Sequence, residues 1–82
     1  MKPELIIKLK EQFKAEEMAY SAYCDLKKHV EDEYLEEAIE EIMYDEFLHA
    51  KFLRTYLMKM NAYDPKQHVD LEQMFTHMLE SE

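Results

Sequence analysis

Two residues with metal-binding chemistry lie in residues 42–53, the stretch IMYDEFLHAKFL. Glu46 and His49 are three positions apart, and residues at this spacing share one face of an α-helix. A carboxylate and an imidazole placed in this way can both reach one metal ion. Both also fall within an apolar helical pattern, where a carboxylate without a partner is costly. The pair therefore predicts part of a metal site, which a neighbouring helix must complete.

The composition predicts a single all-α domain over residues 1–82. The chain has no glycine and only two prolines, and 48% of its residues are hydrophobic, so helix is favoured and tight hairpin turns are not. The formal net charge of -9 argues against sequence-independent binding to nucleic acid or to an anionic membrane, because both attract basic surfaces. An acidic chain of this kind suits a protein that attracts cations.

The elements that must hold the two residues are helices. Periodicity predicts a first helix over about residues 4–30 and a second over about 33–61, with Asp32 as the N-cap of the second. Asp64 followed by proline ends the second helix and starts a short third one over about 65–80. The first two helices are expected to form an antiparallel hairpin.

Each helix carries one apolar face. In the first helix this face consists of Leu9, Phe13, Glu16, Tyr20, Tyr23 and Val30, and Glu16 is its one carboxylate. In the second helix it consists of Leu35, Ile39, Ile42, Glu46, His49, Leu53, Tyr56 and Met60. In the third it consists of Leu71, Phe75, Met78 and Leu79. Most steps are three or four residues, the spacing of helices packed along a partner.

The register of the hairpin identifies the missing carboxylate. With the turn centred near Glu31, Glu16 lies fifteen residues before it and Glu46 fifteen after it. Both carboxylates then lie at one level, on the order of 22 Å from the turn at 1.5 Å per residue. Two carboxylates at one level of an apolar contact raise each other's pKa unless a cation joins them. Glu16, Glu46 and His49 are therefore the predicted metal ligands.

One hairpin supplies too few ligands for a two-metal site and too little surface to enclose a core. A homodimer around a two-fold axis beside Glu46 would form a ferritin-like four-helix bundle. It would bring together four glutamates and two histidines, the ligand set of di-iron carboxylate bundles. The sequence therefore predicts an iron site shared between two subunits.

The chain resembles the encapsulated ferritins, which are half-length ferritin-like proteins. The resemblance rests on Glu16, Tyr23, Glu46 and His49, and covers about residues 8–60. It implies a ferroxidase that oxidises Fe(II) to Fe(III), with these four residues at the catalytic site. It also implies a ring of five dimers that delivers iron to an encapsulin shell for storage or detoxification. The family has further acidic residues near the first glutamate for iron entry, whereas this chain has Ala15 and Met18.

Two other functions are compatible with a helical hairpin. A rubrerythrin-like protein that reduces peroxide needs a second iron centre held by Cys-x-x-Cys pairs, and this chain has one cysteine, Cys24. A structural helical adaptor would bind no metal and would use polar residues only to fix register. His29, His68 and His77 have no carboxylate at ligand spacing on an apolar face and are expected at the surface. The single cysteine and the lack of a signal or membrane segment predict a cytoplasmic location, inside an encapsulin compartment if the resemblance holds.

Overall fold

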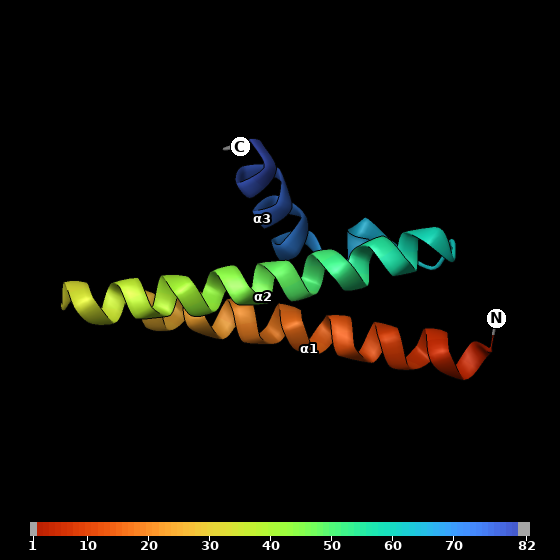
Figure 1. The fold of residues 1–82 in the computed structure, drawn as a ribbon, viewed down its shortest axis with the longest axis horizontal. Coiled ribbons are helices and arrows are strands. Elements are labelled where there is room, and N and C mark those ends of the chain that lie inside the picture. Colours follow the sequence, from red (N-terminus) through yellow and green to blue (C-terminus); the bar gives the residue numbers. More distant parts are fainter. Residues whose placement is uncertain (1, 81–82) are drawn as a thin grey trace.

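The computed structural model describes residues 2–80 and the side chains of residues 2–77. Every regular element in this part of the chain is helical, as predicted: α1 (Pro3–Lys27), α2 (Glu33–Lys59), the 3₁₀ turn η1 (Pro65–Gln67) and α3 (Val69–Glu80). The long helices α1 and α2 run antiparallel along each other, and α3 projects from the middle of the pair (Figure 1). None of the described helices combines the length and apolarity that would let it cross a membrane.

The turn between the long helices follows from local hydrogen bonding. α1 ends at Lys27, three residues before the predicted end, because the N–H groups of residues 28–30 bond to carbonyls three residues back instead of four. Such bonds tighten and terminate a helix. Asp32 caps α2 as predicted, since its Oδ2 accepts a hydrogen bond of 2.9 Å from the N–H of Leu35.

The end of α2 and the third segment are also set locally. Asn61 adopts a left-handed conformation with φ 55°, and the N–H of Ala62 bonds to the carbonyl of Leu57 at 2.8 Å, a usual way to end a helix. The predicted third helix over 65–80 is divided, because the non-helical backbone of His68 (φ -136°, ψ 53°) separates η1 from α3. Asp64 caps η1 by accepting from the N–H of Lys66 at 3.0 Å.

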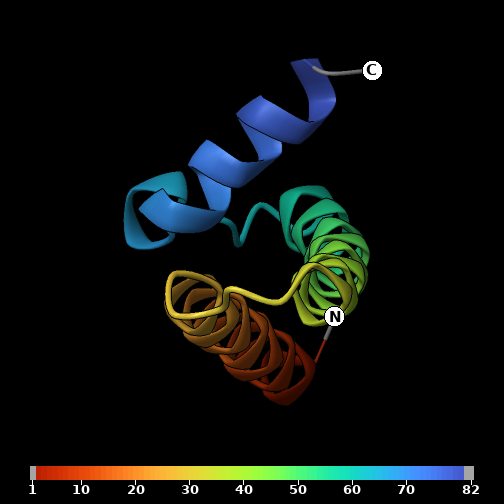
Figure 2. The ribbon, with the colours of Figure 1, turned by 90° about the vertical axis from the view of Figure 1, so that its left-hand side faces the viewer.

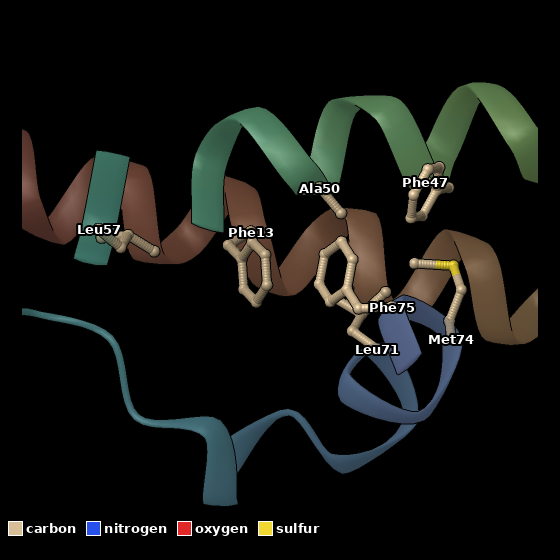
Figure 3. Packing of buried hydrophobic residues seen from close by; sticks show 7 residues of the cluster. All are labelled: Phe13, Phe47, Ala50, Leu57, Leu71, Met74 and Phe75. Atoms are coloured by element: carbon tan, nitrogen blue, oxygen red, sulfur yellow. The ribbon is translucent and has the colours of Figure 1, made fainter. Parts of the chain in front are cut away.

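The apolar core lies where α3 meets the hairpin. Its buried residues come from all three α-helices and are Phe13, Phe47, Ala50, Leu57, Leu71, Met74 and Phe75 (Figure 3). Of the predicted third-helix face, Leu71 and Phe75 are buried here, whereas the side chains of Met78 and Leu79 lie outside the described residues. The prediction missed Phe47, Ala50 and Leu57, which are the residues that α2 contributes to this core.

The other face of the hairpin has no third helix over it, since α3 lies on one side of the α1–α2 pair when viewed along the helices (Figure 2). On α2, three residues predicted to be in the apolar contact are exposed there: Leu35 at 47%, Ile42 at 36% and Tyr56 at 56%. They follow one another at multiples of seven residues, so they share one stripe of the helix. None of the described helices covers these three apolar residues.

A charged contact fixes α3 to α2. The guanidinium of Arg54 donates to both carboxylate oxygens of Glu72, at 2.9 Å from Nε and 3.2 Å from a terminal nitrogen. The hydroxyl of Tyr63 donates to the same carboxylate, and the guanidinium also lies 4.5 Å from the ring centre of Phe75. A bidentate pair of this kind defines orientation as well as adding stability. The contact therefore helps to hold α3 on this side of the hairpin.

Candidate metal site

The structure brings Glu16, Glu46 and His49 together, as the register of the hairpin predicted. One ligand atom from each residue lies within 4.8 Å of the other two. Glu16 comes from α1, whereas Glu46 and His49 lie one turn apart on α2. Nδ1 of His49 is 3.6 Å from Oε1 of Glu16. The antiparallel pairing of the two long helices is therefore what assembles the group.

The site is buried on one side and open on the other. The side chain of Glu16 is only 13% exposed, whereas that of His49 is 60% exposed. His49 is seven residues from both Ile42 and Tyr56, so it lies on the uncovered apolar stripe of α2. A molecule that covered this stripe would also cover the imidazole.

The proximity of Glu16 changes the acidity of Glu46. A hydrogen bond with Glu16, then burial and the negative charge of Glu16, raise the pKa of Glu46 to about 7, and the nearby His49 partly opposes this rise. Near neutral pH the pair therefore retains a proton for much of the time. A divalent cation in place of that proton would remove the repulsion between the carboxylates, because an opposite charge favours their ionised forms.

The donor set fits a first-row transition metal such as iron, which accepts carboxylate oxygen and imidazole nitrogen ligands. With metal–ligand bonds of about 2.1 Å, ligand atoms on opposite sides of an ion are about 4 Å apart. The observed spread of up to 4.8 Å is close to this value, so small side-chain adjustments would allow one ion to contact all three groups. One chain offers two carboxylates and one imidazole, half of the set predicted for two irons.

The remaining predicted site residue, Tyr23, is partly buried on α1. It is seven residues from Glu16, which corresponds to about 10 Å along the helix axis. This places it beside the three ligands along the helix, at a distance unsuited to direct coordination of the same ion. Its catalytic role stays a prediction of the family resemblance.

The other histidines divide into two kinds. His29 and His77 are exposed, as expected. The prediction for His68 was wrong, because its side chain is only 11% exposed. Its ring lies edge-on against Phe13 with centroids 4.5 Å apart and stacks on Tyr63 at 5.9 Å. Sequence spacing could not show this, because Phe13, against which the ring packs, comes from a distant part of the chain.

His68 contacts a second buried carboxylate that the sequence reasoning missed. Glu17 is 7% exposed, and its Oε1 lies 3.3 Å from Nδ1 of His68 and 3.1 Å from Nζ of Lys14. The one sequence signal was that Glu17 follows Phe13 by four residues and so shares its helical face. This cluster of Glu17, His68 and Lys14 is separate from the three candidate ligands, and the ammonium of Lys14 compensates the charge of Glu17.

The arrangement of Glu16, Glu46 and His49 can bind a divalent cation through two oxygens and one nitrogen, at a surface-facing edge of the hairpin. It can also release a proton from the carboxyl pair as the cation binds. In comparisons with known proteins, no family model, no curated protein and no solved structure matches this chain.

Proposed function

We propose that this chain is a ferroxidase that binds Fe(II) with Glu16, Glu46 and His49 and oxidises it to Fe(III) at a site shared by two copies of the chain. The observation that carries the proposal is the meeting of these three donors within 4.8 Å from two antiparallel helices. The abundance of carboxylates favours a hard or borderline cation, and the imidazole favours a transition metal over Ca²⁺ or Mg²⁺.

Each residue has a distinct role in this proposal. Glu46 would bridge two Fe(II) ions, and it would release the proton that its raised pKa of about 7 lets it hold as the ions bind. Glu16 is a terminal carboxylate ligand and His49 a terminal nitrogen ligand. Each Fe(II) gives up one electron, which O₂ or peroxide accepts. The negative charge of the carboxylates favours the more highly charged product ion.

The partner in this proposal is a second copy of the chain. The uncovered stripe of Leu35, Ile42 and Tyr56 runs on both sides of His49 along α2, so one packing contact would bury the stripe and enclose the site. A two-fold axis beside Glu46 would double the ligands to four glutamates and two histidines. Assembly into a ring of dimers and delivery of iron to an encapsulin shell stay predictions of the resemblance.

The direct test measures metal content, oligomeric state and turnover of the purified protein. We expect a dimer or larger assembly by light scattering, two Fe(II) per dimer under anaerobic conditions, and growth of Fe(III) absorbance after O₂ or peroxide is added. A protein that binds no iron would support the structural adaptor instead. A monomer that keeps one or more irons per chain would show that the site is complete within one subunit.

The dimer contact is tested separately by a charge placed on the stripe. Ile42→Glu should dissociate the dimer and lower the iron content, because a carboxylate would be buried without a partner. Met58→Glu is the matched control, since Met58 is an apolar residue of the same helix that is 53% exposed and lies off the stripe. Equal oligomeric states for the two variants would contradict the proposed interface.

A further inference from the structure

We propose that His68 and Glu17 are positioning residues for the metal site, because their contact fixes the rotation of α1 that aims Glu16 at Glu46 and His49. This inference rests on the proposed function, since it concerns how that site is held. Neither residue coordinates metal in this proposal. They act through the backbone of the α1 turn that carries both Glu16 and Glu17.

The contact is well suited to hold a helix in one orientation. The side chains of His68 and Glu17 are 11% and 10% exposed, so both are largely removed from water. The His68 ring is also held between Phe13 and Tyr63, which leaves it little freedom to follow a displaced carboxylate. A buried carboxylate with such fixed partners tolerates little movement, because separation would leave it buried without its hydrogen-bond partner.

Because Glu16 and Glu17 are adjacent on α1, a contact that holds Glu17 in place also holds the direction in which Glu16 points. Consecutive residues are about 100° apart around an α-helix, so Glu16 and Glu17 point toward different neighbours while sharing one rigid backbone turn. Side-chain tips lie about 5–6 Å from the helix axis. A rotation of α1 by about 10° would therefore move the Glu16 carboxylate by about 1 Å. Metal sites need their ligands placed more accurately than this, within about 0.5 Å.

A second contact that holds α3 in place, between Arg54 and Glu72, can be compared with the His68 contact. Arg54 and Glu72 join α3 to α2, whereas His68 joins the segment before α3 to α1. Both contacts hold the same part of the chain onto the hairpin, and both are partly or largely buried. Only the His68 contact reaches the turn that carries a candidate ligand. Loss of either contact should loosen α3, but only loss of the His68 contact should disturb metal binding.

The experiment uses the full chain and Co(II), which replaces Fe(II) in oxygen and nitrogen sites and reports its ligand geometry by visible absorption. We expect His68→Leu and Glu17→Leu to weaken Co(II) binding about tenfold, at the lower end of losses seen for residues that support metal ligands, and to alter the absorption spectrum. Glu72→Gln is the matched control. It should lower the melting temperature while affinity stays within about twofold of the wild type.

Conservative variants keep the test informative if the leucine variants fold poorly. His68→Asn places an amide N–H donor near the position of the histidine Nδ1, so this variant should restore most of the affinity. Glu17→Gln keeps an oxygen that accepts from His68 and should do the same. Wild-type Co(II) affinity in a folded His68→Leu protein, or equal losses in His68→Leu and Glu72→Gln, would overturn the positioning role alone. A wild type that binds neither Co(II) nor Fe(II) would overturn the proposed function first, and this inference with it.

Discussion

Glu16 and Glu17 are neighbours on α1 with nearly equal burial, and each lies beside a histidine, yet the charges of their other partners differ. Their side chains are 13% and 10% exposed. Glu17 meets the cationic Lys14 and the ring nitrogen of His68, whereas Glu16 meets a second carboxylate, Glu46, with His49 beside it. Glu17 therefore has a lysine ammonium among its partners, whereas Glu16 faces another carboxylate.

This difference separates a structural carboxylate from a candidate functional one. A buried charge persists when partners in the fold neutralise it. Where two carboxylates face each other instead, an incoming cation can neutralise their charge. The raised pKa of Glu46 is a consequence of this proximity. Perturbed groups of this kind are concentrated at functional sites. Four predictions test the contrast, in order of decreasing expected effect.

The largest effect should be on Fe(II) oxidation. Glu46→Gln and His49→Ala should each lower the oxidation rate at least about 100-fold, because each removes a proposed ligand from both halves of the dimer. Glu17→Gln should lower it by less than about tenfold. Stopped-flow absorbance at matched protein and iron concentrations gives the rates. Glu41→Gln, an exposed carboxylate elsewhere on α2, is the control and should match the wild type. Similar rates for Glu46→Gln and Glu41→Gln would rule out the ligand role.

Replacing one carboxylate of each cluster by leucine should change stability in opposite directions. In chelator, Glu17→Leu should lower the free energy of unfolding by about 2 kcal/mol, since it leaves the buried ring nitrogen of His68 without its carboxylate partner. Glu46→Leu should raise it by about 1 kcal/mol at pH 8, because it removes the repulsion with Glu16. Denaturant unfolding measures both. Saturating Fe(II) should then stabilise the wild type relative to Glu46→Leu. A clearly destabilised Glu46→Leu in chelator would assign Glu46 a structural role.

The metal-free protein should lose stability as pH rises through about 7. The pKa of Glu46 in the folded chain, about 7, lies above its ordinary value of 4.5. The protonated group therefore contributes stability that is fully present below about pH 4.5 and is lost as pH rises through about 7. Melting temperatures between pH 5 and 8 should fall more in the wild type than in Glu46→Gln. Metal affinity should rise over the same range, because ligands bind deprotonated. If the melting temperatures of the wild type and of Glu46→Gln changed equally with pH, the raised pKa of Glu46 would be contradicted.

The smallest effect should come from an exposed carboxylate that is paired at the surface. Nζ of Lys27 lies 3.0 Å from Oε1 of Glu40, but their side chains are 37% and 49% exposed. Water and salt screen such a pair. Glu40→Gln should change the free energy of unfolding by less than about 0.5 kcal/mol and leave metal affinity unchanged. A larger loss of unfolding free energy would show that the ion pair between Lys27 and Glu40 stabilises the hairpin even though both charges are solvated.

The sequence by itself determined the helices and the level at which the candidate ligands meet. Local signals were enough for the caps at Asp32 and Asp64, because a capping side chain bonds to amides two or three residues away. The spacing of Glu46 and His49 placed them on one helical face. Once the position of the turn was known, the constant rise per residue of both helices placed Glu16 opposite these two residues. These features depend on short-range geometry, which the order of residues specifies directly.

Only the tertiary structure decided which face of the hairpin is covered and how the second buried carboxylate is satisfied. α2 has apolar residues on two faces, and periodicity cannot tell whether α3 packs on Phe47 and Ala50 or on Leu35 and Ile42. The contact between Glu17 and His68 spans 51 residues, and it forms because the Arg54–Glu72 pair and the apolar core hold α3 on that side. The choice depends on the combined free energy of many distant contacts, which no single stretch of sequence contains.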